Sequence, residues 1–214
     1  KRMELSNLAW ALARLEVLCR VLPSLTDAVM RQLQEMNTQD LANVVWSLAH
    51  VPAKEAPLLV AVAVQVRPRC AFMNAQDLTN IASSYAKLLL REERMMHCVA
   101  QQVKVCICSL SQQELCSLLW AFAALWIRHP VLEEVLARLA MRAAVLTERE
   151  MCCVAWAVPS CLAQDAPCTC CLASTRTGHE LPRKYKQPTW KPPEGTPPQW
   201  QAGRQEPAHW QRSR

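Results

Sequence analysis

The chain has 214 residues, and its 24 Lys and Arg against 18 Asp and Glu give a formal net charge of +6, too small an excess to indicate nucleic-acid binding by itself. All three Gly lie after residue 158, so the first 158 residues cannot contain the Gly-dependent turns of a P-loop, a GxGxxG dinucleotide site or a GxSxG nucleophile elbow. Nucleotide-driven and hydrolase-fold enzymes are therefore not expected, and abundant Ala, Leu, Glu, Gln and Met favour helix over strand.

No apolar run reaches the roughly 20 residues that a membrane-spanning helix needs, so we expect a soluble protein without a membrane partner. Helical pattern begins directly at Lys1, with neither an initiator Met nor a targeting segment, which predicts a fragment of a longer chain. The twelve Cys lack the spacing of a small secreted scaffold, and at least six lie in helical pattern. We therefore expect reduced thiols in an intracellular or organellar compartment.

An internal repeat organises the first 158 residues. Five segments align without gaps, and we use the first apolar core residue of each as its marker. The markers are Leu5, Leu41, Leu78, Leu115 and Met151, at spacings of 36, 37, 37 and 36 residues. Five positions after the markers stand Trp10, Trp46, Ser83, Trp120 and Trp156. This regularity predicts one structural unit repeated along the chain.

Each unit from the second onward begins with the residues of a helix start. The N-cap residues are Asn37, Asn74, Ser111 and Thr147, and three positions later stand the acidic partners of a capping box, Asp40, Asp77, Glu114 and Glu150. Such a pair satisfies backbone donors that the first turn leaves open. From each marker, apolar residues then recur every three or four positions. A helix is predicted to begin at each N-cap.

A second amphipathic segment follows in each unit, over residues 24–36, 57–66, 91–106 and 130–145, with Pro57 and Pro130 at first-turn positions. One hairpin of about 37 residues cannot bury its apolar face alone. We therefore predict an all-α fold in which residues 1–158 form an α-solenoid of about four to five helical hairpins, with Pro159 ending the last helix. Residues 159–214 are rich in Pro, Gln and Trp and lack periodicity; a disordered tail is expected.

The repeated helix resembles a known family at the segment NTQDLANVVWSLAHV, residues 37–51. It is similar to the signature helix of the octotricopeptide repeat, to the helical repeats of FAST-kinase-like and RAP-domain organelle proteins, and to the helical-repeat proteins of the mitochondrial RNA-editing substrate-binding complex. The residues that carry the likeness are Gln39, Asp40, Leu41, Asn43, Trp46, Leu48 and Ala49. The likeness covers residues 1–158 and is weakest in the fifth unit, where Cys153 replaces the Asn.

The resemblance implies an organellar protein, mitochondrial rather than chloroplast, that binds single-stranded RNA and acts in RNA processing, stability or translation. Its partners would be RNA and other proteins of an organellar ribonucleoprotein complex. The RAP module of some relatives is not visible in this sequence, so no nuclease activity carries over. We expect a protein that is not an enzyme and that uses no cofactor or metal.

Polar residues of the repeated helix gather opposite the marker on a helical wheel. This candidate RNA-binding ladder consists of Asn7, Arg14, Gln39, Asn43, Ser47, His50, Gln76, Asn80, Ser84 and Lys87. Amides can match base edges and cations can neutralise phosphates, so we expect the ladder to line a concave groove. The alternative is that Asn7, Asn43 and Asn80 tie adjacent repeats together, as buried polar residues do.

Other features allow more than one interpretation. The repeated Trp could stack on bases, but a fixed register beside small Ala residues favours packing between repeats. Cys161, Cys168, Cys170, Cys171 and His179 lack a CxxC pair at a usual zinc spacing.

The opposing functional class is a protein-interaction scaffold of the HEAT or armadillo type. Residues 1–158 hold sixteen basic and fourteen acidic side chains, so little of the basic excess lies in the array. In the last two units Ala121, Ala124 and Ala157 stand where polar readers would be expected.

Overall fold

The structure, a computed structural model, describes residues 2–51 and 55–162. Within these ranges it is all-helical, as the repeat predicts. Five inner helices are α1 (Arg2–Arg14), α3 (Thr38–Leu48), α5 (Ala75–Lys87), α7 (Gln112–Ala124) and α9 (Glu148–Leu162). Four outer helices are α2 (Leu22–Gln32), α4 (Ala56–Val66), α6 (Glu93–Cys106) and α8 (Val131–Met141). A disordered tail was expected from residue 159 onward. Residues 163–214 lie outside the described ranges.

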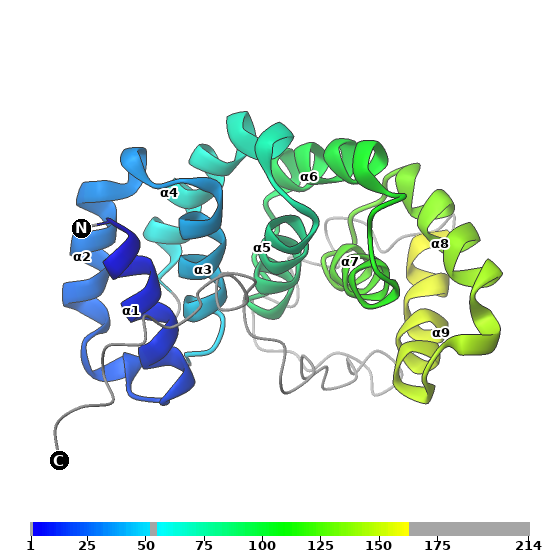
Figure 1. Cartoon of the computed structure of the whole chain (residues 1–214), viewed down its shortest axis with the longest axis horizontal. Helices are drawn as coiled ribbons and strands as arrows, with labels where there is room; N and C mark the ends of the chain where they lie inside the picture. The colour runs from blue at the N-terminus through cyan, green and yellow to red at the C-terminus, as the bar shows by residue number, and fades with distance from the viewer. Residues whose placement is uncertain (1, 52–54, 163–214) are drawn as a thin grey trace, which may run out of the picture.

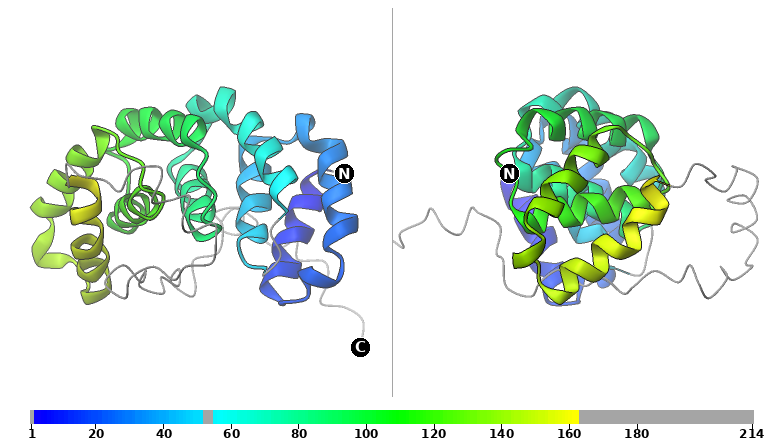
Figure 2. Two further views of the ribbon diagram at one scale, coloured as in Figure 1. Left: turned by 180° about the vertical axis from the view of Figure 1, so that it is seen from behind. Right: turned by 90° about the vertical axis from the view of Figure 1, so that its right-hand side faces the viewer.

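The helices form two layers. Each inner helix packs against the next inner helix, each outer helix packs against the next outer helix, and each hairpin joins the layers. Figure 1 shows the result as an arch, with α2, α4, α6 and α8 along the outside and the inner helices along the inside. The views from behind and from the end agree (Figure 2). The predicted α-solenoid is confirmed.

The predicted helix starts are confirmed by their hydrogen bonds. At α3 the backbone N–H of Asp40 donates to Oδ1 of Asn37 over 2.8 Å, and the Asp40 carboxylate accepts from the Asn37 backbone over 3.3 Å. Ser111 with Glu114 and Thr147 with Glu150 make the same reciprocal pairs at α7 and α9. At α5 the side chain of Asn74 accepts from the backbone of Asp77 over 2.7 Å. Each pair fixes the residue at which an inner helix begins.

Three inner helices end without the glycine that such ends favour. Glu16, Leu89 and Trp126 have φ values of 58°, 53° and 54°, the left-handed region in which a side chain costs about 1 kcal/mol or more. After α5 the backbone N–H of Leu90 donates to Tyr85 and that of Leu89 donates to Ala86, over 3.0 Å each. This is the Schellman arrangement. The Gly-free array therefore turns between its layers by placing ordinary residues in the left-handed conformation.

Pro159 does not end the last helix, contrary to the sequence prediction. The helix α9 runs from Glu148 to Leu162 with Pro159 inside it. A proline in a helix removes one donor and leaves the carbonyl four residues earlier without its usual partner. That residue here is Ala155, which is exposed, so water can solvate the carbonyl.

The apolar core runs continuously between the layers. The markers Leu41, Leu78 and Leu115 are fully buried, but Met151 is 52% exposed. The expectation that Met151 is a core residue is therefore wrong. In the described part of the chain no inner helix packs on the far side of α9, so its marker lacks the neighbour that covers the other markers.

The capping carboxylates also join neighbouring repeats. The Ser6 hydroxyl of α1 donates to Oδ1 of Asp40 over 2.6 Å, and the Gln112 amide of α7 donates to Oε2 of Glu150 over 2.7 Å. Asp77 of α5 lies near Thr38 of α3, whose hydroxyl acts to lower the pKa of the Asp77 carboxyl. Asp40 and Glu150 thus each cap their own helix and accept from the previous inner helix, a link that the sequence analysis did not predict.

Asp77 gives the fold a specific pH dependence. Burial raises its pKa to about 6, although the hydrogen bonds from Thr38 and Asn74 act in the opposite direction. The folded pKa lies above the unfolded value of about 3.9, so the folded state gains stability on protonation, and this gain is lost as the pH rises through 6. We expect Asp77→Asn to raise the free energy of unfolding at pH 7 by about 2–3 kcal/mol. Urea denaturation at pH 4 and pH 7 measures this difference.

The control is Asp27→Asn, which removes an exposed carboxylate from α2. The expected pattern is that the stability gain of Asp77→Asn over the parent shrinks as the pH falls below 6. A gain that is equal at pH 4 and pH 7 would contradict the assigned pKa.

Candidate nucleic-acid interface

The candidate interface is the inside of the arch, where each internal inner helix has neighbours on three sides. The helix α3 packs against α1, α5 and α4, and α5 packs against α3, α7 and α6. Only a narrow side of each helix, opposite its marker, is therefore left without a packed helix, and some of its residues, such as Asn43 and Ser117, are still buried. We call the positions two before, two after and nine after the marker the inner strip, because these three positions lie opposite the marker on a helix of 100° per residue.

Part of the predicted ladder is buried, contrary to the expectation of a solvent-facing polar face. Asn43 is 4% exposed, Ser84 1% and Ser47 0%. The wheel treats a helix as having one buried side, whereas these side chains lie between neighbouring inner helices. The Ser47 hydroxyl donates over 2.7 Å to the backbone carbonyl of Asn43 one turn earlier. We therefore withdraw these three residues as candidate RNA contacts.

The rest of the ladder reaches the surface. Five residues are half-buried, namely Asn7, Gln39, Gln76, Asn80 and Lys87, and Arg14 and His50 are exposed. All seven occupy inner-strip positions of α1, α3 and α5 or of the turns that follow them. The structure thus brings the amides and the cations of three consecutive units to one side of the array. Whether they bind RNA stays a prediction.

The strongest cluster lies where α1, α3 and α5 end. His50 Nδ1 lies 2.7 Å from the Trp46 carbonyl oxygen, and its Nε2 lies 3.1 Å from Nζ of Lys87. The carbonyl can only accept, so Nδ1 carries the proton and Nε2 accepts from the Lys87 ammonium. The imidazole also lies against the indole of Trp46, with ring centroids 3.8 Å apart. Lys87, from the third unit, is therefore held beside an aromatic pair of the second.

Electrostatics agree with this arrangement. Partial burial, followed by the charges of Lys87 and Arg14, lowers the pKa of His50, although its hydrogen bond to the Trp46 carbonyl acts in the opposite direction. His50 is therefore neutral at pH 7, as its contacts require. Burial also lowers the pKa of Lys87 to about 8, so most of its population is still protonated at pH 7. Two cations, Arg14 and Lys87, thus flank a neutral imidazole.

The repeated Trp residues lie between repeats. The rings of Trp10 and Trp46 are 6.2 Å apart across the junction of α1 and α3, and Trp120 is 3% exposed. The packing interpretation is confirmed for these three side chains. Trp156 is half-buried on α9.

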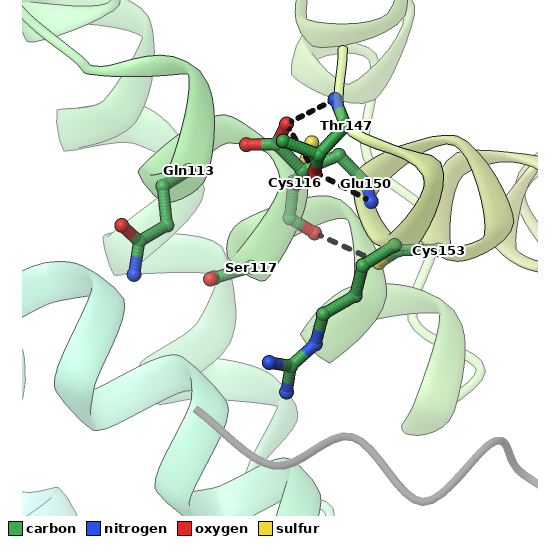
Figure 3. A pocket seen from close by; sticks show the side chains of 7 residues that line it. Gln113, Cys116, Ser117, Thr147, Glu150 and Cys153 are labelled. Carbon is green, nitrogen blue, oxygen red and sulfur yellow. Dashed lines mark hydrogen bonds between the residues drawn. The ribbon is translucent and has the colours of Figure 1, made fainter. Parts of the chain in front are cut away.

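A pocket between α7 and α9 was missed by the sequence analysis. Its volume is about 200 Å³, and it is lined by Gln113, Cys116, Ser117, Thr147, Arg149, Glu150 and Cys153. Figure 3 shows the labelled side chains around it. Gln113 and Arg149 stand two positions before their markers, the position of Gln39 and Gln76 in the ladder. That shared register is the sequence signal that points to this pocket.

The inner strip carries no carboxylate. Its fifteen positions hold amides, hydroxyls, one thiol, one imidazole and small or apolar side chains, together with Arg14, Lys87 and Arg149. They are Met3, Asn7 and Arg14; Gln39, Asn43 and His50; Gln76, Asn80 and Lys87; Gln113, Ser117 and Ala124; and Arg149, Cys153 and Ser160. The array as a whole is nearly neutral, so this strip concentrates cations on one side.

Other chemistry is limited within residues 2–51 and 55–162. Three or more His, Cys, Asp or Glu side chains do not come together there in a way that could hold a metal ion. No helix in these ranges has the length and apolar character that crossing a membrane requires. Of the Cys-rich segment considered for zinc, Cys168, Cys170, Cys171 and His179 lie outside the described residues.

Comparison with known families identifies the array. The family model described as RNA-editing substrate-binding complex 6 protein matches residues 4–161. The chain belongs to this family. The matched range covers all nine described helices almost from end to end. None of the curated proteins matches the chain. The resemblance to octotricopeptide-repeat and FAST-kinase-like proteins stays a prediction, whereas the resemblance to the editing-complex helical-repeat proteins is confirmed at family level.

Proposed function

We propose that the chain binds single-stranded RNA along the inner strip, as part of a mitochondrial ribonucleoprotein complex that acts in RNA editing. The matching family is named for an RNA-editing substrate-binding complex, which supports a role in organellar RNA processing. In this proposal the protein contributes binding and carries out no reaction itself. It positions or shields a transcript on which other components act.

One observation carries the proposal, namely that the inner strip has three formal cations and no carboxylate while the whole array is nearly neutral. A cation on this strip can neutralise a phosphate, and each phosphate contact releases counterions that favour binding. The amides of Gln39, Gln76 and Asn80 lie on the same side and can both donate to and accept from base edges.

In this proposal the main RNA-binding site is the cluster of Arg14, His50 and Lys87. The three side chains come from consecutive units at the same register, so the solenoid places them in sequence along its inside. Lys87 donates to His50, which fixes the direction of its ammonium group. Phosphates of an extended strand can be bound by Arg14 and Lys87, with His50 between them able to contact a ribose or base.

A second surface supports contact with other proteins of the complex. On the outer side, Phe72 is 80% exposed, Val105 77% and Met141 79%. Phe72 ends the 3-10 helix Arg67–Phe72 that follows α4, Val105 lies in the last turn of α6, and Met141 ends α8. Three exposed apolar side chains at equivalent places in consecutive repeats are candidates for contact with another protein of the complex, which a scaffold function would use.

The proposal is tested by removing the two cations of the cluster. We expect the double variant Arg14→Ala, Lys87→Ala to bind a labelled 20-nucleotide single-stranded RNA at least about a hundredfold more weakly, because two charge-assisted contacts are lost and each contributes roughly 1.5–3 kcal/mol. The slope of log affinity against log salt should fall by about 1.4, or about 0.7 for each lost phosphate contact. Fluorescence anisotropy at several salt concentrations measures both quantities.

The matched control is Arg31→Ala, which removes an exposed cation from the outer helix α2 and should leave affinity and salt slope close to those of the parent. Failure of the parent chain to retain any RNA at moderate salt would reject RNA binding and favour the scaffold. Equal losses in the control and in the double variant would place the contact elsewhere than on the inner strip.

A further inference from the structure

The pocket between α7 and α9 combines a buried floor with a polar rim. Ser117 is 4% exposed and Cys153 6%, and both lie two positions after their markers. Gln113 and Arg149 are exposed at the edge and lie two positions before their markers. Two successive units therefore contribute the same pair of inner-strip positions. Figure 3 shows Gln113 and Ser117 on the α7 side and Thr147, Glu150 and Cys153 on the α9 side.

The residues that line the pocket fall into two groups, those whose side chains are already hydrogen-bonded and those whose side chains are not. The Glu150 carboxylate accepts from the backbone and hydroxyl of Thr147 over 2.8 Å each, and from Gln112 over 2.7 Å. Although burial acts in the opposite direction, these hydrogen bonds lower the pKa of Glu150, so the carboxylate stays ionised at neutral pH and its acceptor sites are occupied. In the described part of the chain, Gln113, Ser117 and Arg149 make no hydrogen bond or ion pair through their side chains.

Ser117 is the decisive member of the second group. Buried hydroxyls usually have a partner, and on the neighbouring inner helices Ser47 and Ser83 each donate to a carbonyl one turn earlier over 2.7 Å. Among the described residues Ser117 makes no such bond; the residue as a whole is 4% exposed, and its hydroxyl oxygen keeps some contact with solvent at the pocket that it lines. Its hydroxyl is therefore available to a molecule that enters the pocket.

The floor is uncharged. Burial raises the pKa of both Cys116 and Cys153 to about 12, so both thiols are protonated at neutral pH and act as small apolar groups. The Cys153 thiol donates to the Cys116 carbonyl at 3.5 Å. A flat apolar group can lie on this floor while polar groups at its edge contact Gln113 and Ser117.

The size and chemistry of the pocket fit one nucleotide. Its volume of about 200 Å³ is below the roughly 300–1,000 Å³ of most small-molecule sites. An amide and a hydroxyl can donate to and accept from a base edge, and a guanidinium can bind the adjoining phosphate. A peptide carboxylate would use Arg149 but would leave the thiol floor without a partner.

We propose that the α7–α9 pocket binds one nucleotide of single-stranded RNA, with the base edge on Gln113 and Ser117 and a backbone phosphate on Arg149. This inference rests on the proposed function and extends the RNA path from the cluster at α1, α3 and α5 to the last described repeat junction. The pocket then fixes the register of the strand, because a base enters it while Arg14 and Lys87 of the cluster hold phosphates.

The test combines affinity with the position of contact. We expect the double variant Gln113→Ala, Arg149→Ala to bind a labelled single-stranded RNA about tenfold more weakly, with a salt slope lower by about 0.7 for the one lost phosphate contact. Ser117→Ala should weaken binding about threefold and leave the salt slope unchanged, because the hydroxyl contacts no phosphate. RNA that contains 4-thiouridine should crosslink to peptides of α7 or α9 in the parent chain.

The controls are Gln101→Ala on the exposed side of α6 and Arg31→Ala on α2, which remove the same two chemical groups from the outer layer. The side chains altered in the double variant and in the two controls are all exposed, so the circular dichroism melts of these variants should coincide with that of the parent.

The outcomes separate the pocket from the proposed function. If the parent binds RNA and the α1–α5 cluster variant weakens binding, but the pocket variants match their controls and no crosslink forms on α7 or α9, the pocket inference alone is overturned. If the parent binds no RNA, the proposed function fails as well. Binding of an acidic peptide that depends on Arg149 would assign the pocket to a protein partner.

Discussion

Tyr85→Ala should lower the free energy of unfolding by about 3–5 kcal/mol, the range for truncating a large aromatic side chain in a packed core. Tyr85 is fully buried on α5, the central inner helix. Its phenol donates over 2.6 Å to the backbone carbonyl of Leu59 on α4, so the side chain joins the inner layer to the preceding outer helix. Burial raises the pKa of the phenol, which keeps the donor protonated. Urea denaturation followed by circular dichroism measures the loss.

The matched variant is Tyr85→Phe, which keeps the ring and removes only the hydroxyl. We expect it to cost about 1 kcal/mol, the net contribution of one hydrogen bond. A loss for Tyr85→Phe as large as that for Tyr85→Ala would mean that the hydrogen bond to Leu59, and not ring packing, holds the two layers together. A loss below 1 kcal/mol for Tyr85→Ala would contradict its assignment as a core residue.

The fold followed from the sequence because its signals are local. An N-cap residue and an acid three positions later, as in Asn37 and Asp40, specify where a helix begins whatever surrounds it. The spacing of the markers then specifies the repeat, and a repeat of about 37 residues with two amphipathic segments has few ways to bury its apolar sides. Helix starts, hairpins and the two layers could therefore be predicted without coordinates.

The end of the array could not be predicted in the same way, because it depends on neighbours. Met151 occupies the register of three buried leucines, but its burial requires a further helix beside α9. Pro159 interrupts one hydrogen bond, and whether that ends a helix depends on whether water reaches the freed carbonyl. Neither the presence of a further helix nor the access of water can be predicted from the residues around Met151 and Pro159.

The candidate interface was predicted only in part for a related reason. A helical wheel separates the side facing the marker from the side opposite it, and it correctly brought Arg14, His50 and Lys87 together. It could not show that neighbouring inner helices close over Asn43 and Ser84, because that depends on the spacing between helices. Nor could it show that the α7–α9 junction stays open beside Ser117. The sequence shows which helix positions can form a site, whereas the burial of each side chain depends on how neighbouring helices pack.

Asp40→Ala should be the most damaging change at a repeat junction, with an expected loss of about 3 kcal/mol. Removing the carboxylate removes a helix cap, which costs about 1 kcal/mol. It also removes the charge-assisted hydrogen bond that the buried Ser6 hydroxyl donates to Asp40 over 2.6 Å, a contribution of about 1.5–3 kcal/mol. In the double-mutant cycle, Ser6→Ala combined with Asp40→Ala should cost less than the two single losses added together.

Glu114 provides a matched control, because it caps α7 through Ser111 and, in the described ranges, accepts no hydrogen bond from the previous inner helix. We expect Glu114→Ala to cost only the capping contribution of about 1 kcal/mol. Equal losses for Asp40→Ala and Glu114→Ala would mean that the link to Ser6 adds no stability. Repeat arrays are stabilised by contacts between nearest neighbours, so the Asp40 variant should also show faster amide hydrogen exchange in α1 and α2 than in α5 to α8. Uniformly faster exchange along the whole array would instead indicate that the hairpins unfold as one unit.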